Sequence, residues 1–198
     1  DSIIVEPLST AHLEGILEIH LSELKSSLTS YFGRGFVSKM YLQMLETGWG
    51  FAAVKTSNSQ VQGYIFADRK FTFFRCLTSR STLKVALAII TNPSAFTDIL
   101  ASVFHQLYIR FVVSEAANSE AVEISNFAVL EASKSMGIGS TLISAFEQQA
   151  RQSGYTTIST NTQNNRLVQF YMQKKNARQV CISKVFNRRI ILLHWDLK

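Results

Sequence analysis

The sequence predicts an α/β fold in which helices flank one mixed β-sheet. In the C-terminal half, strand-like and helix-like segments alternate from Ala121 to Leu197, which is typical of α/β proteins. Near the N-terminus, two runs rich in β-branched and aromatic residues flank Ser57-Asn58-Ser59, and turn residues between such runs predict a β-hairpin. A chain of 198 residues has a common size for one globular domain, and its 46% hydrophobic residues can fill a sizeable core, so we expect residues 1–198 to form a single domain.

The N-terminal elements follow from the spacing of apolar residues. A short apolar run, Ile3 to Val5, precedes Pro7, and apolar residues recur at helical intervals from Leu13 to Leu24. Ser9 and Thr10 are candidates to cap that helix. The sequence thus predicts a strand at 3–5, helices at 13–24 and 35–46, and hairpin strands at 49–55 and 61–67.

Two residues in the C-terminal half are expected to end helices. Gly154 is expected to end one helix. Asn176 is expected to end the next, because asparagine is the best substitute for glycine in left-handed backbone. The sequence predicts strands at 121–130, 155–160, 177–185 and 189–197, and helices at 137–152 and 164–175.

Residues 70–110 read as an insertion of two amphipathic helices, broken at Asn92-Pro93. The segment is both apolar and basic. Such a segment could add to the hydrophobic core, form the interface of a homodimer, cover the acceptor site, or contact a membrane surface peripherally. We favour the first two.

Composition narrows the classes of function. The formal net charge of +6 suits an anionic ligand, but the basic residues are scattered, so nucleic acid is not an expected partner. Cys76 and Cys181 lie far apart, which indicates reduced thiols in a cytoplasmic protein and no metal site. No apolar stretch approaches the roughly 20 residues that cross a bilayer.

The most informative stretch runs from Phe127 to Ser140. It reads as a strand, a loop and a helix that opens with Gly137 and Gly139. The first N–H groups of a helix lack internal partners and the helix dipole makes that end positive, so a pyrophosphate fits there. Leu142 stands where a dinucleotide-binding fingerprint needs a third glycine. On spacing alone, a tight turn before an amphipathic helix explains the pattern at least as well.

Three linked pieces resemble the GNAT N-acetyltransferases over about residues 121 to 185. Lys134-Ser135-Met136-Gly137-Ile138-Gly139 resembles the family's pyrophosphate loop, (Gln/Arg)-x-x-Gly-x-(Gly/Ala), with Lys134 in the place of Gln or Arg. Phe127-Ala128-Val129 resembles the strand before that loop. Asn164, Leu167, Phe170 and Tyr171 occupy the offsets of a later Asn-x-x-Ala-x-x-Phe-Tyr pattern, and Asn176-Ala177 replaces the Gly-Phe pair that follows it.

This resemblance implies the GNAT fold, with a mostly antiparallel sheet, and acetyl-CoA as the co-substrate. It implies that strand 127–129 is splayed from its neighbour and holds the pantetheine arm, while the loop amides hold the pyrophosphate. The implied acetyl-CoA contacts are Phe127, Ala128, Val129, Lys134, Ser135, Met136, Gly137, Ile138, Gly139, Ser140 and Asn164.

Acetyl transfer to an amine needs a base for the ammonium and an acid for the departing thiolate. Tyr171 matches the family position that protonates the CoA sulfur; aromatic packing beside Leu167 is the structural alternative. Glu123 lies on the strand before the loop and is the candidate base; an ordinary strand-end carboxylate is the alternative. Asn164 can bind the cofactor, cap its helix, or do both.

The resemblance places the acceptor near the first two helices. There, Tyr31, Phe32 and Arg34 could stack on a sugar or pair with an acidic group, or simply form an interhelical turn. His12 and His20 are expected at the surface, and no pair of histidines has metal-ligand spacing.

The leading hypothesis is an acetyl-CoA-dependent N-acetyltransferase that acts on a small amine or an amino sugar. A protein lysine or N-terminus is the alternative acceptor. A third reading is a non-catalytic GNAT module that senses acyl-CoA.

Overall fold

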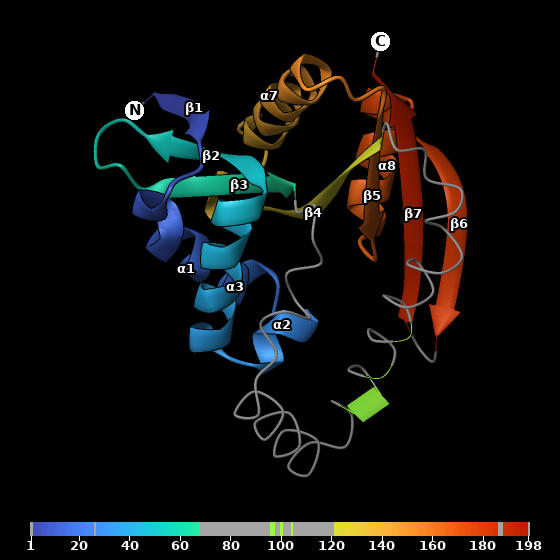
Figure 1. The fold of residues 1–198 in the computed structure, drawn as a ribbon, viewed down its shortest axis with the longest axis horizontal. Coiled ribbons are helices and arrows are strands. Elements are labelled where there is room, and N and C mark those ends of the chain that lie inside the picture. The colour runs from blue at the N-terminus through green and yellow to red at the C-terminus, as the bar shows by residue number, and fades with distance from the viewer. Residues whose placement is uncertain are drawn as a thin grey trace. The chain divides into compact units, whose positions relative to one another are not determined.

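The computed structural model describes residues 2–25, 27–67, 96–97, 100, 104, 121–185 and 188–197 (Figure 1). The predicted insertion at 70–110 therefore lies almost wholly outside the described residues. The strands form one seven-stranded sheet in the order β1-β2-β3-β4-β5-β7-β6. The prediction of a single mixed sheet flanked by helices is confirmed.

The described residues divide into two compact units. The first holds β1 to β3, α1 to α3 and the stretch Ser125–Gln149, and the second holds the start of β4 up to Ile124 and everything after Gln149. The elements of the first are β1 (Ile3–Pro7), η1 (Thr10–His12), α1 (Leu13–Glu23), α2 (Leu28–Tyr31), α3 (Arg34–Thr47), β2 (Trp49–Lys55), β3 (Val61–Ala67), most of β4 (Ala121–Val129), η3 (Glu131–Ser133) and most of α7 (Ile138–Gln152).

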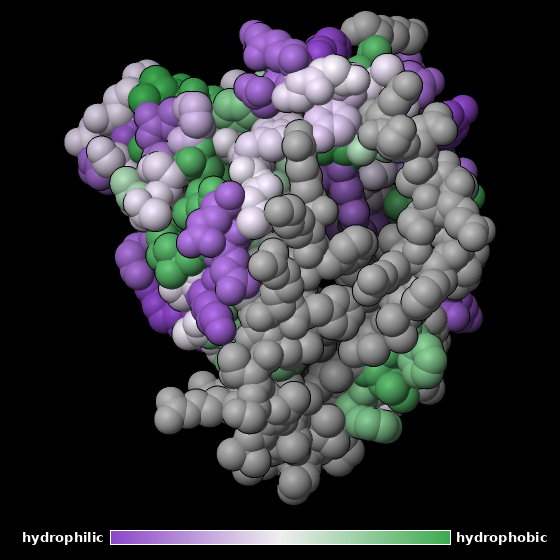
Figure 2. Space-filling model, in the orientation of Figure 1, coloured by the Kyte–Doolittle hydropathy of each residue, from purple (hydrophilic) through white to green (hydrophobic). Residues whose placement is uncertain are grey.

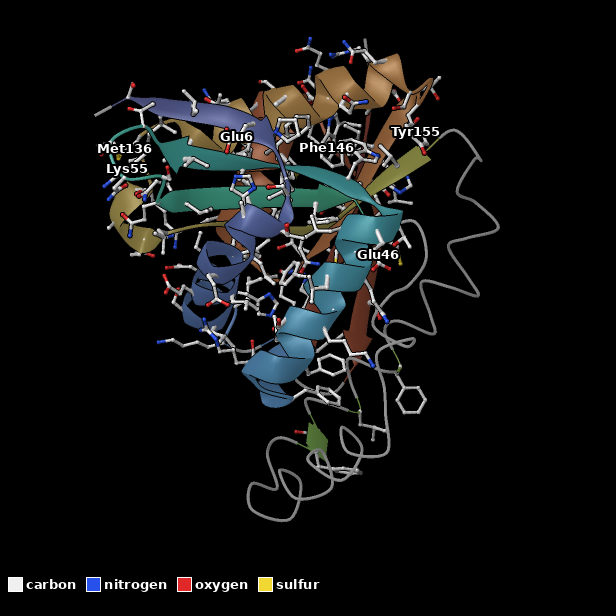
Figure 3. All side chains as sticks on the ribbon, turned by 60° about the vertical axis from the view of Figure 1, so that its left-hand side comes forward. Glu6, Glu46, Lys55, Met136, Phe146 and Tyr155 are labelled. Atoms are coloured by element: carbon white, nitrogen blue, oxygen red, sulfur yellow. The ribbon has the colours of Figure 1, made fainter. Side chains whose placement is uncertain are left out.

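In the first unit, β2 and β3 separate two layers of helices. Tyr64 and Phe66 on β3 pack into a core with α1 and α3. On the other face, Phe146 of α7 (Figure 3) packs against Trp49 with ring centroids 4.4 Å apart and the ring planes tilted by 31°. The alternation of strand side chains explains how both faces are filled. Over α1 and α3, Figure 2 shows hydrophilic side chains beside apolar ones, as expected for helices with one face in water.

The second unit is built from β5 (Thr157–Thr162), α8 (Asn165–Lys175), β6 (Arg178–Val185) and β7 (Arg188–Asp196). β7 lies antiparallel between β5 and β6, and α8 packs on β5 and β7. Asn176 ends α8 with φ 52° and ψ 33°, which confirms the predicted left-handed stop. Gly154, with φ 80°, follows α7 as predicted.

A polar cluster lies inside the core of the first unit. His20 is fully buried, its Nδ1 lies 2.8 Å from the Tyr41 hydroxyl, and its Nε2 lies 2.8 Å from Thr29 Oγ1. The Tyr41 and Tyr64 hydroxyls are 2.6 Å apart. The expectation that His20 lies at the surface is therefore wrong, because His20 follows Ile16 by four residues and shares its buried helix face.

The expectation was also wrong for His12. Its side chain is buried, with Nε2 2.6 Å from Glu6 Oε1. Its Nδ1 accepts the backbone N–H of Ser9 at 3.0 Å. Ser9 and His12 thus form a capping box, in which His12 takes the place usually held by Glu or Gln.

Candidate active site

The glycine loop leads from β4 into α7 within the first unit. Ser135 and Gly137 have positive φ values of 72° and 80°, a region that suits glycine. A Cβ added to Gly137 would meet nothing within 4 Å, whereas one on Gly139 would lie 3.2 Å from Phe127 Cζ. Gly137 therefore has an open side that a ligand can approach. Gly139 lets α7 pack closely against the β4 strand.

Two buried polar residues fix the start of this loop. Ser133 Oγ donates to Gln62 Oε1 at 2.6 Å, and the N–H of Leu130 donates to the Gln62 carbonyl at 2.9 Å. Both Ser133 and Gln62 are buried. Sequence reasoning missed this anchor, because nothing in the local pattern around Gln62 links it to a segment some 70 residues later in the chain.

Lys134, which replaces the family's Gln or Arg, ties the loop to α1. Its Nζ lies 2.9 Å from Glu23 Oε2 and also contacts Glu131. The hydrogen bond to Glu131, followed by that to Glu23, raises the pKa of Lys134. Burial alone would raise the pKa of Glu23, but the hydrogen bonds from Lys134 and from the Glu131 N–H lower it. The ammonium group thus serves as a cross-link between helix and loop.

We expect Lys134→Gln to lower the free energy of unfolding by less than about 1 kcal/mol, because exposed ion pairs contribute little. Acetyl-CoA affinity should change by less than about threefold, since the substitution leaves the backbone N–H groups in place. Thermal unfolding and isothermal calorimetry measure the two quantities. A tenfold loss of affinity with unchanged stability would mean that Lys134 contacts acetyl-CoA mainly through its ammonium group and not through its backbone or side-chain stem.

The remaining predicted loop residues are mostly open to solvent. Ser135, Met136 and Ser140 are exposed, and Met136 retains 59% of its accessible surface (Figure 3). Ile138 is buried and faces the core from the first turn of α7. The exposed backbone at the start of α7 is where the pyrophosphate was predicted.

The parallel pairing of β4 and β5 is short. It covers Ala121–Ile124 and Thr157–Thr160, although β4 continues to Val129. The pairing of β4 with β5 therefore ends before Phe127 to Val129, the residues predicted to hold the pantetheine arm.

Tyr171 lies beside the last β4–β5 pair, on the face covered by α8. It is 1% exposed and stacks on Trp195 with ring centroids 5.2 Å apart. Its hydroxyl is hydrogen bonded to Thr160, and Thr160 Oγ1 donates to the Ile124 carbonyl at 3.3 Å. Burial raises the pKa of Tyr171 well above its usual value, and the bond to Thr160 offsets this only in part. The phenol therefore stays protonated at neutral pH.

Glu123 lies beside the same pair on the opposite face of the sheet. Its Oε1 accepts a hydrogen bond from Asn161 Nδ2 at 2.8 Å. Asn161 follows Thr160 directly, so the two side chains point to opposite faces of β5. The two predicted proton-transfer residues thus flank the point where β4 and β5 stop pairing, one on each face.

Asn164 caps the N-terminus of α8, which is one of the two roles predicted for it. Its Oδ1 accepts the N–H groups of Arg166 and Leu167 at 2.9 and 3.4 Å. The side chain is exposed, so capping and contact with a ligand are compatible.

The predicted acceptor loop is less open than expected. Phe32 is 4% exposed and stacks on Phe36 with centroids 4.4 Å apart, so it belongs to the core. Arg34 is ion-paired with Glu14. The side chain of Tyr31 lies outside the described part of the structure. The short helix α2, which the sequence analysis treated as a turn, fills this position.

Neither a metal-ligand cluster nor a membrane-spanning helix occurs in the described ranges. There, no group of three His, Cys, Asp or Glu side chains could hold a metal ion. In the same ranges, no helix is long and apolar enough to cross a membrane.

Residues 103–175 match the family model of the acetyltransferase (GNAT) family. Over these residues the chain therefore matches a GNAT acetyltransferase domain. The match contains the β4 strand, the glycine loop and α8. It therefore covers the three pieces of the sequence resemblance apart from Asn176-Ala177, and it begins upstream of the segment 121–185. The chain is accordingly an acyltransferase, and GNAT enzymes use acetyl-CoA.

Solved structures support the GNAT fold of this chain. Arabidopsis thaliana NAA60 in complex with acetyl-CoA is 15% identical, with a TM-score of 0.63 over 99% of each chain. The ribosomal-protein-S18-alanine N-acetyltransferase from Escherichia coli is 9% identical, with a TM-score of 0.60 over 100% of this chain and 95% of that one. A GNAT acetyltransferase from Staphylococcus aureus Mu50 is 12% identical, with a TM-score of 0.61 over both complete chains. No curated protein sequence matches the chain.

Proposed function

We propose that this GNAT domain transfers the acetyl group of acetyl-CoA to the amine of a small molecule or an amino sugar. The observation that carries the proposal is the end of the β4–β5 pairing at Ile124 and Thr160. A carboxylate and a protonated phenol flank this point, and β4 continues from it into a loop with an open glycine. These are the groups that amide formation from a thioester requires.

In the proposed reaction, Glu123 removes a proton from the acceptor ammonium. The amine nitrogen then bonds to the thioester carbon, and backbone N–H groups of β4 stabilise the negative charge on its oxygen. The C–S bond breaks, and the sulfur takes the proton of the Tyr171 hydroxyl. The nitrogen loses its second proton as the amide forms, and this proton restores the Tyr171 phenol. Loop amides from Gly137 onward hold the pyrophosphate, with Phe127, Ala128 and Val129 along the pantetheine arm. Lys134, Ser135, Met136, Ile138, Gly139, Ser140 and Asn164 complete the proposed contacts.

We expect Tyr171→Phe to lower kcat by about 100-fold, the lower end of the range for general acid catalysis, and to leave acetyl-CoA affinity unchanged. Phenylalanine keeps the ring that stacks on Trp195 and removes only the hydroxyl. Single-turnover CoA release measures the chemical step, and calorimetry measures binding. Normal turnover in this variant would mean that a group other than Tyr171 is the general acid.

The experiment that tests the function combines two assays. Calorimetry should detect acetyl-CoA binding, and CoA release should depend on one class of acceptor in a panel of amines, amino sugars and peptides. Binding without turnover on any acceptor would favour the non-catalytic sensor.

Protein acceptors form the second candidate class. One of the similar structures carries the name of a protein acetyltransferase, the ribosomal-protein-S18-alanine N-acetyltransferase, at an identity that bears on the fold alone. Turnover confined to peptides would select this alternative. For the cell compartment, we propose the cytoplasm, since Cys76 and Cys181 lie far apart in the sequence and show no disulfide framework.

A further inference from the structure

The turn that leads into α7 is exposed and lies between two buried residues. Lys134 to Gly137 are exposed, whereas Ser133 before them and Ile138 after them are buried. The N–H of Met136 donates to the Ser133 carbonyl at 3.4 Å, so Ser133 is itself the first residue of the turn. Ile138 is held by the burial of its apolar side chain, but the short polar side chain of Ser133 needs a polar partner. The position of the turn therefore depends on what holds Ser133.

Gln62 holds this start of the turn through both its side chain and its main chain. Ser133 Oγ donates to Gln62 Oε1 at 2.6 Å, and the N–H of Leu130 donates to the Gln62 carbonyl at 2.9 Å. Gln62 Nε2 donates to the Gln60 carbonyl at 3.3 Å. Because a carbonyl can only accept, this bond orients the amide so that its oxygen faces Ser133. Both ends of the Gln62 amide are thus committed.

The base of this tether is a rigid part of the first unit. All seven residues of β3 are buried, and a Cβ added to Gly63 would lie 3.0 Å from the Ala128 carbonyl oxygen. The backbones of β3 and β4 therefore approach closely beside Gln62. The bond to Ser133 extends this fixed geometry beyond the end of β4 and into the turn.

We propose that Gln62 is a positioning residue for acetyl-CoA, which acts through Ser133 to hold the turn before α7 in the conformation that binds the pyrophosphate. The proposal rests on the proposed function, because it assumes that the loop amides from Gly137 onward hold that group. Without the tether, the turn would populate other conformations. The apparent affinity then falls in proportion to the fraction of molecules that keeps the competent one.

A second tether of the same loop is expected to matter less. The ion pairs of Lys134 with Glu23 and Glu131 are largely exposed, and such pairs contribute little. The bond between Ser133 and Gln62 is buried, and loss of one partner would leave the other without a hydrogen bond and away from water. The buried tether should therefore have the larger effect on the conformation of the turn.

The test compares Ser133→Ala with the double variant Gln62→Met, Ser133→Ala. The single variant strands the Gln62 amide oxygen, so it should lower both the stability and the acetyl-CoA affinity, the latter by on the order of tenfold. In the double variant both partners are apolar, which is nearly neutral for stability. Its unfolding midpoint should return towards that of the native protein, while its affinity stays roughly tenfold weaker because the tether is still absent.

The measurements are denaturant unfolding, calorimetry with acetyl-CoA, and kcat at saturating acetyl-CoA, which should stay unchanged. Gln60→Met is the matched control, because Gln60 is exposed and only its main chain contacts Gln62. This control should keep the native stability and affinity.

A truncated acetyl donor separates positioning of the turn from a general structural defect. S-acetylpantetheine carries the thioester and the pantetheine arm but lacks the pyrophosphate. In the double variant, kcat/KM should fall roughly tenfold with acetyl-CoA and stay at the native value with S-acetylpantetheine. Equal losses with the two donors, or an affinity that recovers together with stability, would overturn the role of Gln62. Absence of acetyl-CoA binding by the native protein would instead overturn the proposed function.

Discussion

Glu123→Gln should lower kcat by about 100-fold or more, because general base catalysis typically contributes that much. Glutamine has the size of glutamate and keeps an oxygen that can accept the Asn161 side-chain N–H, which lies 2.8 Å away in the native protein. The substitution therefore removes the proton acceptor and preserves its hydrogen bond. The deficit should be largest below the pKa of the free amine, where the acceptor arrives as an ammonium ion.

Glu46→Gln is the matched control. Glu46 is an exposed carboxylate on α3 in the other unit (Figure 3), so its loss should leave kcat unaltered. The measurement is CoA release against pH with the best acceptor of the panel, alongside acetyl-CoA affinity. A Glu123→Gln enzyme with the wild-type pH profile would show that Glu123 is a structural partner of Asn161 and no base.

The sequence predicted most elements of this fold because their signals are local. The hairpin strands 49–55 and 61–67 coincide with the observed β2 and β3, since β-branched runs around turn residues leave little choice of register. The stop at Asn176 depends only on the backbone preference of one residue. The short α2 was missed, because four residues carry too little periodicity to be recognised.

The site could be predicted only where its parts are contiguous in the chain. The glycine loop lies within one segment, and its open glycine was expected. The links of Glu123 to Asn161 and of Ser133 to Gln62 join residues 38 and 71 positions apart. Such pairs depend on which strands become neighbours.

The second large effect concerns stability and arises from His20. Burial lowers the pKa of His20 to about 4, from 6.5 when exposed. A neutral imidazole offers one donor and one acceptor, which suits its contacts with the Tyr41 and Thr29 hydroxyls. Burial also raises the pKa of Tyr41 and of Tyr64 above the usual value. Tyr41 on α3 and Tyr64 on β3 are the described titratable groups beside His20. Both phenols stay neutral, so neither supplies a negative charge that could balance the positive charge of a protonated His20.

The sign of the effect follows from proton binding. Between pH 6.5 and about 4, His20 is protonated in the unfolded chain and neutral in the folded one. The unfolded state therefore binds more protons, and the free energy of unfolding falls as the pH falls. Above pH 6.5 the two states bind equally at this residue, and the stability is complete. The full shift corresponds to about 3 kcal/mol, at 1.36 kcal/mol for each pKa unit.

We expect this loss of unfolding free energy at low pH in the native protein but not in the His20→Gln variant. Denaturant unfolding from pH 7 to pH 4 includes the titration of every carboxylate, but these contributions are common to both proteins. Glutamine keeps a donor and an acceptor and does not titrate, so its variant should start less stable at pH 7 and lose about 3 kcal/mol less on acidification. Parallel curves would mean that His20 protonates in the folded state near its ordinary pKa. The buried contacts with Tyr41 and Thr29 would then have to open within the native fold.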